Sequence, residues 1–243
     1  MANPTAQDVI DRVRQVLNES EAGLYTDTPA NLLQALNGGG LHFHRDVLAA
    51  VRQQGPLDPG HPYVRHFIRT GTDTLSTNDA TIAVPDDLEE ILTVLIGPQG
   101  DGTITGSGGL SGERIMRPAQ RVANADEGLM HVSRIHGPRQ GLAAWHPIND
   151  SGTLEIQLYV YPGNNGIPTQ SLPYRLIYVK LPDRAATISD TLSWPWDYMD
   201  PLVWYACAHA VPRERKMYDA YLGLGQAQVP GIAGIYPQQG QQQ

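Results

Sequence analysis

The sequence predicts an α+β fold: N- and C-terminal helices packed as a small bundle, with a central antiparallel β insertion and a flexible C-terminal tail. Apolar residues recur with helical spacing near both chain ends, alternate with polar residues in the middle, and give way to Gln at the end. These patterns divide the 243 residues into an N-terminal helical part (1–78), a β-rich insertion (79–192), closing helices that complete the bundle (193–224) and a Gln-rich tail (225–243).

The first helix is predicted to begin at Thr5. Its hydroxyl can cap the amides near Asp8, which is a capping box with a shorter acid than usual. Apolar residues then follow the helical period at Val9, Ile10, Val13, Val16 and Leu17.

A second helix is predicted from Thr28-Pro29, because a capping side chain followed by Pro is typical of a helix start. Its apolar positions continue to Val51, and Gly55-Pro56 ends it. Gly38, Gly39 and Gly40 interrupt the pattern. Three glycines at about 1 kcal/mol each disfavour a helix, so a break or kink is expected there.

The first part of the insertion contains shorter elements. Tyr63, Phe67 and Ile68 indicate a short helix after Pro62, and residues 80–84 alternate like a strand. Residues 88–96 are predicted to form a second, apolar strand. The Gly-rich stretch 97–112 is predicted to be a mobile loop.

The strongest strand signals come later in the insertion. Residues 154–160 and 174–179 alternate clearly, and the reversal signal at 162–166 lies between them. They are therefore predicted to pair with each other, in one small sheet that includes the strands at 80–84 and 88–96. Trp145 and residues 130–135 are expected to add further strands.

The closing helix is predicted to start at Ser193-Trp-Pro195 or at Asp200-Pro201, because both place a capping side chain before Pro. Pro212 should end or kink it. A second helical piece is expected over 213–224. After Gly225 the chain carries too few large apolar residues to order itself alone.

Charge is distributed unevenly along the chain. The net charge is −8, and residues 71–130 hold ten acids against three bases, which accounts for −7 of it. Such a surface does not attract nucleic acid, because binding phosphates requires Lys and Arg. It could still line a passage through which DNA slides without sticking.

Two further features concern the cellular setting. Cys207 is the sole cysteine, so the chain forms no internal disulfide, and a small buried hydrophobic residue is the favoured interpretation. Residues 1–20 lack the apolar core of a signal peptide, and no run approaches the roughly 18 apolar residues of a membrane helix. A soluble protein made in a cytoplasm, without membrane partners, is expected.

Candidate catalytic chemistry is weak. His42 and His44 would share a face on a strand and could hold a metal, but this stretch is predicted to be helical, where positions i and i+2 point apart. The carboxylates of residues 86–90 could serve glycosidase-type acid–base chemistry, although a solvated acidic face is favoured. The Gly-rich stretch 100–109 lacks the Lys-Ser/Thr ending of a phosphate loop. No catalytic, cofactor-binding or metal site, and no cofactor, is therefore predicted.

Four segments, taken in order, resemble the head-to-tail adaptor (connector) proteins of tailed bacteriophages. The first runs from Thr5 to Arg14, followed by Leu17-Asn18, and the second is Leu33-Gln-Ala-Leu-Asn37. The third is Ile82-Ala-Val-Pro-Asp-Asp-Leu88, and the fourth runs from Pro195 through Trp204 to Ala206. The departures from the pattern are Gly38–Gly40, Pro201 and Pro212.

The resemblance implies a structural virion protein of the neck, not an enzyme. Such proteins form a ring of about twelve copies that contacts the portal protein on one side and a tail or nozzle protein on the other. Double-stranded DNA would pass through the bore without specific binding. Alternatives are another neck or tail component, such as a stopper or tail-completion protein, and a wall-degrading glycosidase using Asp86 or Glu90.

The resemblance also directs attention to two groups of residues. C-terminal segments in this family often reach the portal, so the apolar residues of the tail are portal-contact candidates: Val229, Pro230, Ile232, Ile235 and Tyr236. The aromatic residues around the start of the closing helix are subunit-interface candidates: Trp194, Trp196, Tyr198 and Trp204.

Overall fold

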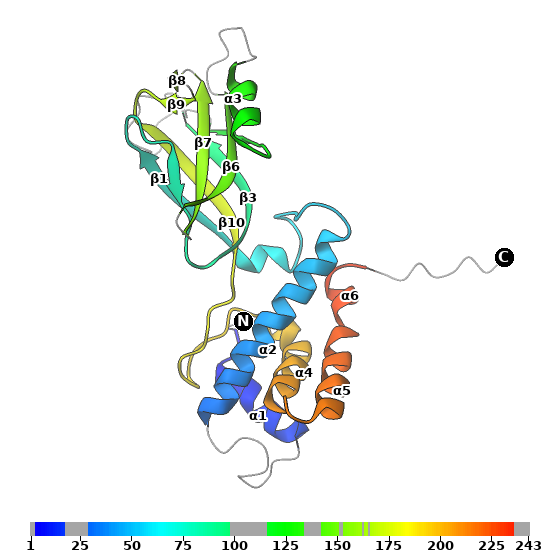
Figure 1. Cartoon of the computed structure of the whole chain (residues 1–243). Coiled ribbons are helices and arrows are strands. Elements are labelled where there is room, and N and C mark those ends of the chain that lie inside the picture. The colour runs from blue at the N-terminus through cyan, green and yellow to red at the C-terminus, as the bar shows by residue number, and fades with distance from the viewer. Residues whose placement is uncertain are drawn as a thin grey trace, which may run out of the picture. The chain divides into compact units, whose positions relative to one another are not determined.

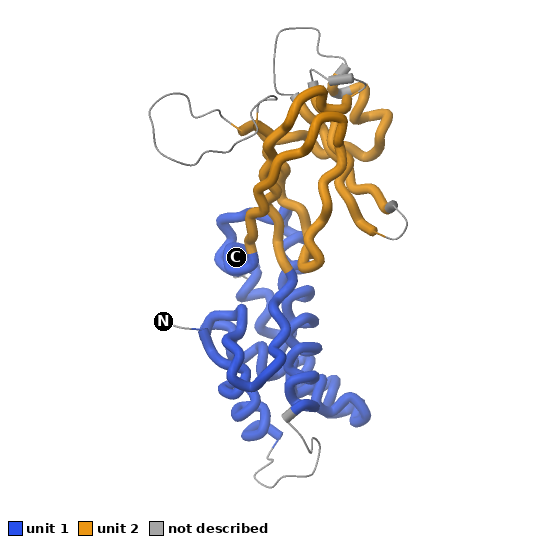
Figure 2. The backbone as a smooth tube through the Cα atoms, turned by 90° about the vertical axis from the view of Figure 1, so that its left-hand side faces the viewer, with its two compact units in different colours: residues 1–67, 181–243 blue, residues 68–180 orange. Residues whose placement is uncertain are grey.

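The computed structural model describes residues 3–17, 29–97, 116–133, 142–150, 153–161, 163–164 and 166–235. Two compact units are present (Figure 2). The helical unit combines Met1–Phe67 with Leu181–Gln243, and the β unit is Ile68–Lys180. The predicted mixed α+β fold with antiparallel sheets is confirmed. The sequence placed the limits of the β-rich part at 79 and 192 instead.

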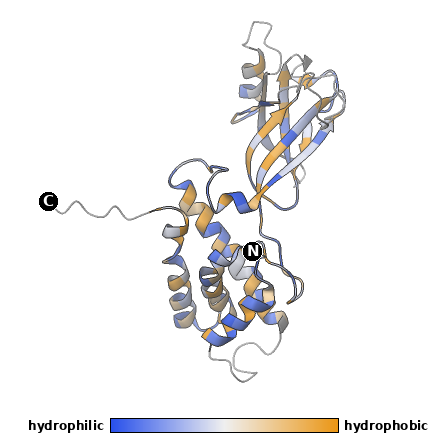
Figure 3. Ribbon diagram, turned by 180° about the vertical axis from the view of Figure 1, so that it is seen from behind, coloured by the Kyte–Doolittle hydropathy of each residue, from blue (hydrophilic) through white to orange (hydrophobic). Residues whose placement is uncertain are grey.

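Helices from both chain ends pack together in the helical unit (Figure 1). α4 is the central one, and α1, α2 and α5 all contact it. Hydrophobic and hydrophilic residues are mixed along each of these helices (Figure 3). Within the described ranges, every helix is too short or too polar to span a bilayer. The elements are α1 (Ala6–Val16), α2 (Pro29–Arg52), η1 (Val64–Phe67), η2 (Trp196–Tyr198), α4 (Met199–Ala210), α5 (Arg215–Gln226) and α6 (Val229–Ile232).

The start of α1 is held by the predicted capping box. The Asp8 amide donates to the Thr5 hydroxyl at 3.3 Å, and the Thr5 amide donates to the Asp8 carboxylate at 2.8 Å. The Thr5 hydroxyl also donates to the Asp8 carboxylate at 2.7 Å. This bond, followed by the bond from the Thr5 amide, lowers the pKa of Asp8, because both favour its charged form. The Ala6 amide also donates to the Asp190 carbonyl at 2.9 Å. The stretch after Lys180 is therefore tied to α1, which places it in the helical unit.

The break predicted at the three glycines is wrong, because α2 runs without interruption from Pro29 to Arg52. The glycines instead allow a close approach. A Cβ at Gly39 would lie 2.7 Å from backbone atoms of Tyr205 in α4, and one at Gly40 would lie 2.5 Å from the Trp194 ring. Close packing of α2 on α4 thus offsets the low helix propensity of glycine. The predicted N-cap, Thr28, lies outside the described residues.

A cluster of buried aromatic rings fills the helical unit beside this contact. Tyr63 is fully buried, and its hydroxyl lies 3.0 Å from His44 Nδ1. The Trp194 indole N–H donates to the same hydroxyl at 3.4 Å. Phe67 packs on both His44 and Trp194, with ring centroids 4.4 and 6.0 Å away. Three segments distant in sequence therefore meet at the Tyr63 hydroxyl.

The β unit consists of two four-stranded sheets around one core. The strand orders are β1-β10-β3-β4 and β2-β7-β6-β5, and a two-stranded β8-β9 ribbon lies beside them. Neighbours pair antiparallel except β5 and β6, which are parallel. The strands are β1 (Ile68–Leu75), β2 (Thr81–Ala83), β3 (Leu88–Ile96), β4 (Arg117–Pro118), β5 (Gln120–Arg121), β6 (Leu142–Asp150), β7 (Thr153–Tyr161), β8 (Gly163–Asn164), β9 (Ile167–Pro168) and β10 (Leu172–Lys180).

The predicted pairing of the two strongest strands is wrong. β7 lies between β2 and β6, whereas β10 lies between β1 and β3 in the other sheet. The predicted single sheet fails for the same reason, because β2 and β3 belong to different sheets. Ile156 and Leu158 of β7 meet Leu176 of β10 across the shared core. Each has one partner that the sequence predicted as a strand, β2 or β3, and one that was harder to recognise, because β1 is polar and β6 contains Pro147.

Three smaller predictions have mixed outcomes. A reversal within the predicted stretch is confirmed, because β8 and β9 pair antiparallel and Gly166 has a φ of 80° that favours glycine, while residues 162 and 165 lie outside the described residues. The strand predicted over 130–135 is wrong up to Ser133, because α3 (Ala125–Ser133) covers those positions. The loop predicted at 97–112 lies outside the described residues beyond Gly97.

The C-terminal segment is ordered further than predicted. α4 ends before Pro212 as expected, but α5 continues to Gln226 and α6 follows it. Val229 and Ala233 are buried, and the Ala233 carbonyl accepts from the Gln54 side chain at 2.6 Å. A flexible tail beginning at residue 225 is therefore wrong up to Ile235, because α2 supplies the partner for this segment.

Replacing Gly39 by Ala should test the close helix contact. The added methyl gains about 1 kcal/mol of helix propensity, but it meets Tyr205 backbone that cannot rotate away. Overpacking of this kind costs about 1–3 kcal/mol, so a net loss of unfolding free energy is expected in urea titrations. Gly223→Ala on α5 is the matched control, because its Cβ meets nothing within 4 Å. Equal stabilisation of both variants would contradict the contact.

The buried imidazole should make the fold acid-sensitive. Burial, aided by Arg45 and Arg52, lowers the pKa of His44 to about 3. An unfolded His titrates near 6.5, so below that pH the unfolded chain binds the proton and the folded chain does not. The contribution of His44 to the free energy of unfolding should therefore be fully present above pH 6.5. At pH 5 the free energy of unfolding should be lower by about 2 kcal/mol because of this group alone. His44→Phe should lose less stability over that range in the same titration, and an equal loss would contradict the assignment.

Candidate interaction site in the helical unit

The four aromatic interface candidates occupy different environments. Trp194 is only 3% exposed and packs inside the unit, so it offers a neighbour almost no surface. Trp196 in η2 is 42% exposed. Tyr198 is half-buried and meets the Tyr63 ring edge-on, with centroids 5.2 Å apart. Trp204 is half-buried on α4. An interface role is therefore proposed below for Trp196, Tyr198 and Trp204 alone.

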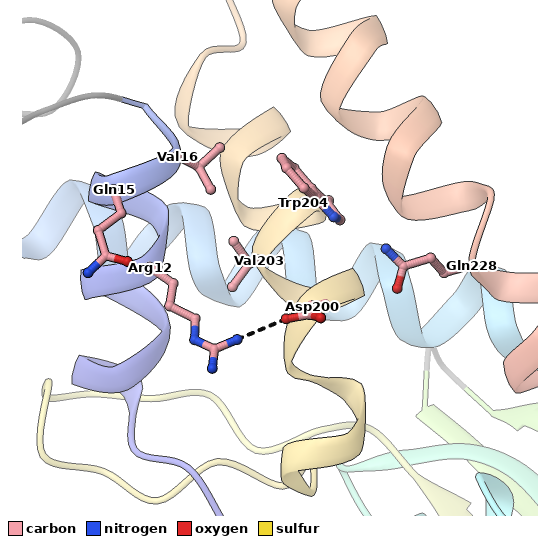
Figure 4. Close-up of a pocket in the computed structure, with 7 residues that line it drawn as sticks. All are labelled: Arg12, Gln15, Val16, Asp200, Val203, Trp204 and Gln228. Carbon is pink, nitrogen blue, oxygen red and sulfur yellow. Dashed lines mark hydrogen bonds and ion pairs between the residues drawn. The ribbon is translucent and has the colours of Figure 1, made fainter.

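Trp204 lies in a groove on the outer side of α4 (Figure 4). The groove has a volume of about 470 Å³. Its floor is apolar, with Val16 from α1 and Val203 from α4 beside the Trp204 indole. The Trp204 ring is held by Tyr221 of α5, which stacks on it at 6.1 Å with an interplanar angle of 17°. The lining residues are Arg12, Gln15, Val16, Asp200, Val203, Trp204 and Gln228.

Polar groups surround this apolar floor. The Arg12 guanidinium donates to the Asp200 carboxylate at 2.8 Å and links α1 to the first turn of α4. Both side chains are well exposed, so the ion pair contributes little to stability. Gln15 and Gln228 add amide groups that can donate and accept hydrogen bonds. An apolar floor with a polar rim suits contact with another protein.

A hydrogen-bonded cluster on α2 connects three helices. The Asp46 carboxylate accepts from the Tyr205 hydroxyl at 2.6 Å and from the Gln226 amide at 3.2 Å. His42 Nδ1 lies 3.3 Å from His209 Nε2. Burial, and then the bond to Asp46, raise the pKa of Tyr205, while burial and nearby His42 lower the pKa of His209. These groups hold α4 and α5 against α2.

The two histidines highlighted in the sequence point apart as the helical interpretation predicted. His42 faces His209 and Asp46, whereas His44 faces Tyr63 in the core. In the described part of the chain, no group of three or more His, Cys, Asp or Glu side chains is placed to hold a metal ion. The single thiol, Cys207, is fully buried, and burial raises its pKa to about 12. It is the buried hydrophobic residue that was predicted.

The acidic stretch 86–90 belongs to the β unit. Asp86 is exposed, and Asp87 accepts a hydrogen bond from the Tyr178 hydroxyl at 3.1 Å. Glu89 and Glu90 are consecutive on β3, where the pairing with β10 shifts register and leaves Glu89 without a cross-strand position. The four carboxylates therefore lie on the turn before β3 and on its first residues.

The portal-contact candidates follow α5. Val229 is buried, Pro230 is exposed, and Ile232 and Ile235 are half-buried. Tyr236 lies outside the described residues. Sequence reasoning missed Gln228, Asp200 and Arg12, whose positions beside Trp204 depend on the packing of α1 and α6 on the unit. The capping box at the start of α1, the helix that carries Arg12, was the one sequence signal that could have pointed to these polar groove residues.

Comparison with known proteins gives a family. The sequence family described as "SU10 adaptor protein" matches residues 4–234. A search among curated proteins gave no match. The match spans nearly the whole chain, including the described helices of the helical unit, the β unit and the groove. This chain therefore belongs to the SU10 adaptor protein family, a family of phage head-to-tail adaptors.

Proposed function

We propose that this adaptor assembles into a closed ring of about twelve copies that joins the portal to the tail or nozzle. The groove beside Trp204 is the observation that supports this best. A ring repeats one contact between two unlike surfaces, so each copy needs a receiving surface and a different inserting surface. The groove, with its apolar floor and polar rim, supplies the receiving surface.

The exposed aromatic residues before α4 supply the second surface in this proposal. Trp196 is not among the groove-lining residues, and its 42% exposed indole is a large apolar group at the surface. Tyr198 lies beside it and is half-buried. Trp and Tyr are enriched at the energetically important centres of protein interfaces. We therefore assign Trp196 and Tyr198 to the face that inserts into the next copy.

The charge of the β unit supports a DNA passage without specific binding. The exposed carboxylates there include Asp73, Asp79, Asp86, Asp126 and Glu127. A duplex carries one negative charge per about 1.7 Å, so a surface of this sign repels it. In the proposed ring these acids line or flank the bore, which lets the genome move without being held.

The portal contact is proposed to involve the end of the chain. Pro230, Ile232 and Ile235 follow α5 and keep some exposed surface, whereas Val229 anchors the segment from inside. Tyr236 and the Gln-rich residues after it complete the segment. A chain end that orders on its partner combines a large contact with ready assembly.

Filling the groove should block ring assembly without unfolding the subunit. Gln15 is an exposed groove residue, so Gln15→Trp places an indole over the floor without removing core atoms. Portal-bound rings, counted by negative-stain microscopy, should fall by more than about tenfold, which corresponds to 1.4 kcal/mol of lost contact. Gln34→Trp is the control, because Gln34 is exposed on α2 away from the groove. Normal rings from Gln15→Trp, or rings of about six copies from the native chain, would contradict the proposal.

Removing residues 236–243 should separate folding from portal binding. The packed residues Val229 and Ala233 remain in this truncation, so its melting temperature should match that of the native chain. Co-sedimentation with portal rings should weaken, because Tyr236 and the Gln-rich residues are removed, whereas Pro230, Ile232 and Ile235 remain. Deleting residues 225–243 should abolish co-sedimentation and lower the melting temperature as well. Normal co-sedimentation of the shorter deletion would exclude a portal contact by residues 236–243, and normal co-sedimentation of the longer one would exclude the assigned role of the whole segment.

A further inference from the structure

The β unit carries one long sheet edge on β1. β1 pairs with β10 along all eight of its residues without a register shift, and no strand of the described residues lies on its other side. The other terminal strands of the two described sheets, β2, β4 and β5, have only two or three residues. β1 contains no Pro and no bulge, and its two charges, Arg69 and Asp73, are the protecting groups that a partner strand has to match. It is therefore a template for another strand.

The outward-facing backbone groups of this edge can be identified. The Thr74 amide donates to the Asp73 carboxylate at 2.7 Å, so it points away from β10. Backbone groups alternate in direction along a strand. Ile68, Thr70 and Thr72 therefore direct their N–H and C=O groups outward as well. Thr70 and Thr72 are exposed, so the centre of the edge is open.

We propose that this edge pairs with the same edge of a second copy of the chain, antiparallel, about a two-fold axis at Gly71. Thr70 of each copy then lies opposite Thr72 of the other, and their outward backbone groups form hydrogen-bonded pairs. Gly71 faces itself in the close, non-hydrogen-bonded position. A Cβ built at Gly71 meets nothing within 4 Å, so the subunit itself leaves this position open.

The charge order of β1 selects this partner and this register. Arg69 and Asp73 are both exposed and lie two residues on either side of Gly71. In the proposed pairing Arg69 of each copy faces Asp73 of the other, which gives two favourable cross-strand pairs. A shift by two residues removes both pairs. A parallel copy in register places like charges side by side, and an apolar strand leaves both charges without partners.

This contact is distinct from the proposed ring contact. An isologous two-fold interface joins two copies, and adding it to a ring would make the two faces of the assembly equivalent, whereas the proposed ring meets the portal and the tail through different faces. The pairing therefore concerns subunits that have not yet joined the ring. The pairing covers an edge that would otherwise favour uncontrolled strand addition. It rests on the geometry of β1, so failure of the ring proposal leaves it unaffected.

Charge reversal in the full-length protein tests the pairing. The native chain, purified without portal, should sediment with twice its subunit mass of 26.5 kDa. Arg69→Asp and Asp73→Arg should each weaken pairing at least about tenfold, because like charges then face each other. An equimolar mixture of the two variants should pair again, and so should the double reversal, since both restore opposite charges. Arg213→Asp, in an exposed turn, is the control.

A cysteine placed on the axis tests the register. The Cα atoms of a non-hydrogen-bonded pair lie about 4.5 Å apart, which a disulfide can bridge. Gly71→Cys should therefore oxidise to a covalent dimer on a non-reducing gel, whereas Thr77→Cys, exposed just beyond β1, should not. Native Cys207 is buried and does not compete. The inference is overturned if the mixed variants stay apart, if the reversals leave pairing unchanged, or if Gly71→Cys does not cross-link.

Discussion

The helical unit depends on the close approach of α2 and α4. Three glycines in the middle of α2 remove the side chains that would hold the helices apart, and Tyr205 and Trp194 occupy the space. Dense packing of this kind converts a poor helix-forming sequence into a continuous helix, because the tertiary contacts outweigh the propensity cost. The position of α4 then determines where the surrounding helices pack.

The groove follows from that arrangement. α4 is apolar over most of its circumference, because α2, α1 and α5 pack around it. The part of its surface near Val203 and Trp204 remains accessible, so the floor of the groove is core-like in composition. The Asp46 cluster fixes α4 and α5 against α2 on another part of the unit. A firmly held receiving surface suits the proposed ring contact, since ordering costs weaken binding.

The β unit uses charge in two different ways. Its exposed carboxylates give a negative surface, which supports the proposed passage of DNA without specific binding. On β1 the balance is local instead, because one Arg and one Asp flank a central glycine. Arg69 and Asp73 disfavour pairing of this edge with most strands. They favour an antiparallel strand that places an acid opposite Arg69 and a base opposite Asp73. The net charge of the β unit therefore bears on the proposed passage of DNA, whereas the order of charges along β1 bears on the proposed choice of partner strand.

Local sequence patterns determined much of this protein. The capping box at Thr5, the strands of the insertion and the stop at Pro212 all depend on interactions within a few residues. The α+β class and the resemblance to phage adaptors were accessible for the same reason. The assignment of Cys207 to the core also followed from its apolar neighbours.

Tertiary structure decided the rest, because the deciding partners are distant in sequence. From the sequence alone, the glycines of α2 predict a break in the helix. In the structure Tyr205 and Trp194 pack against them, and the helix is continuous. The alternating sequences of β7 and β10 favour pairing with each other. Only the tertiary structure shows that β10 lies beside the polar β1 and that β7 lies beside the Pro-containing β6. Trp194 and Trp196 look alike in sequence, yet one is in the core and the other at the surface. Local patterns fix which elements form, and only packing decides which faces they bury, because burial is a property of pairs of elements.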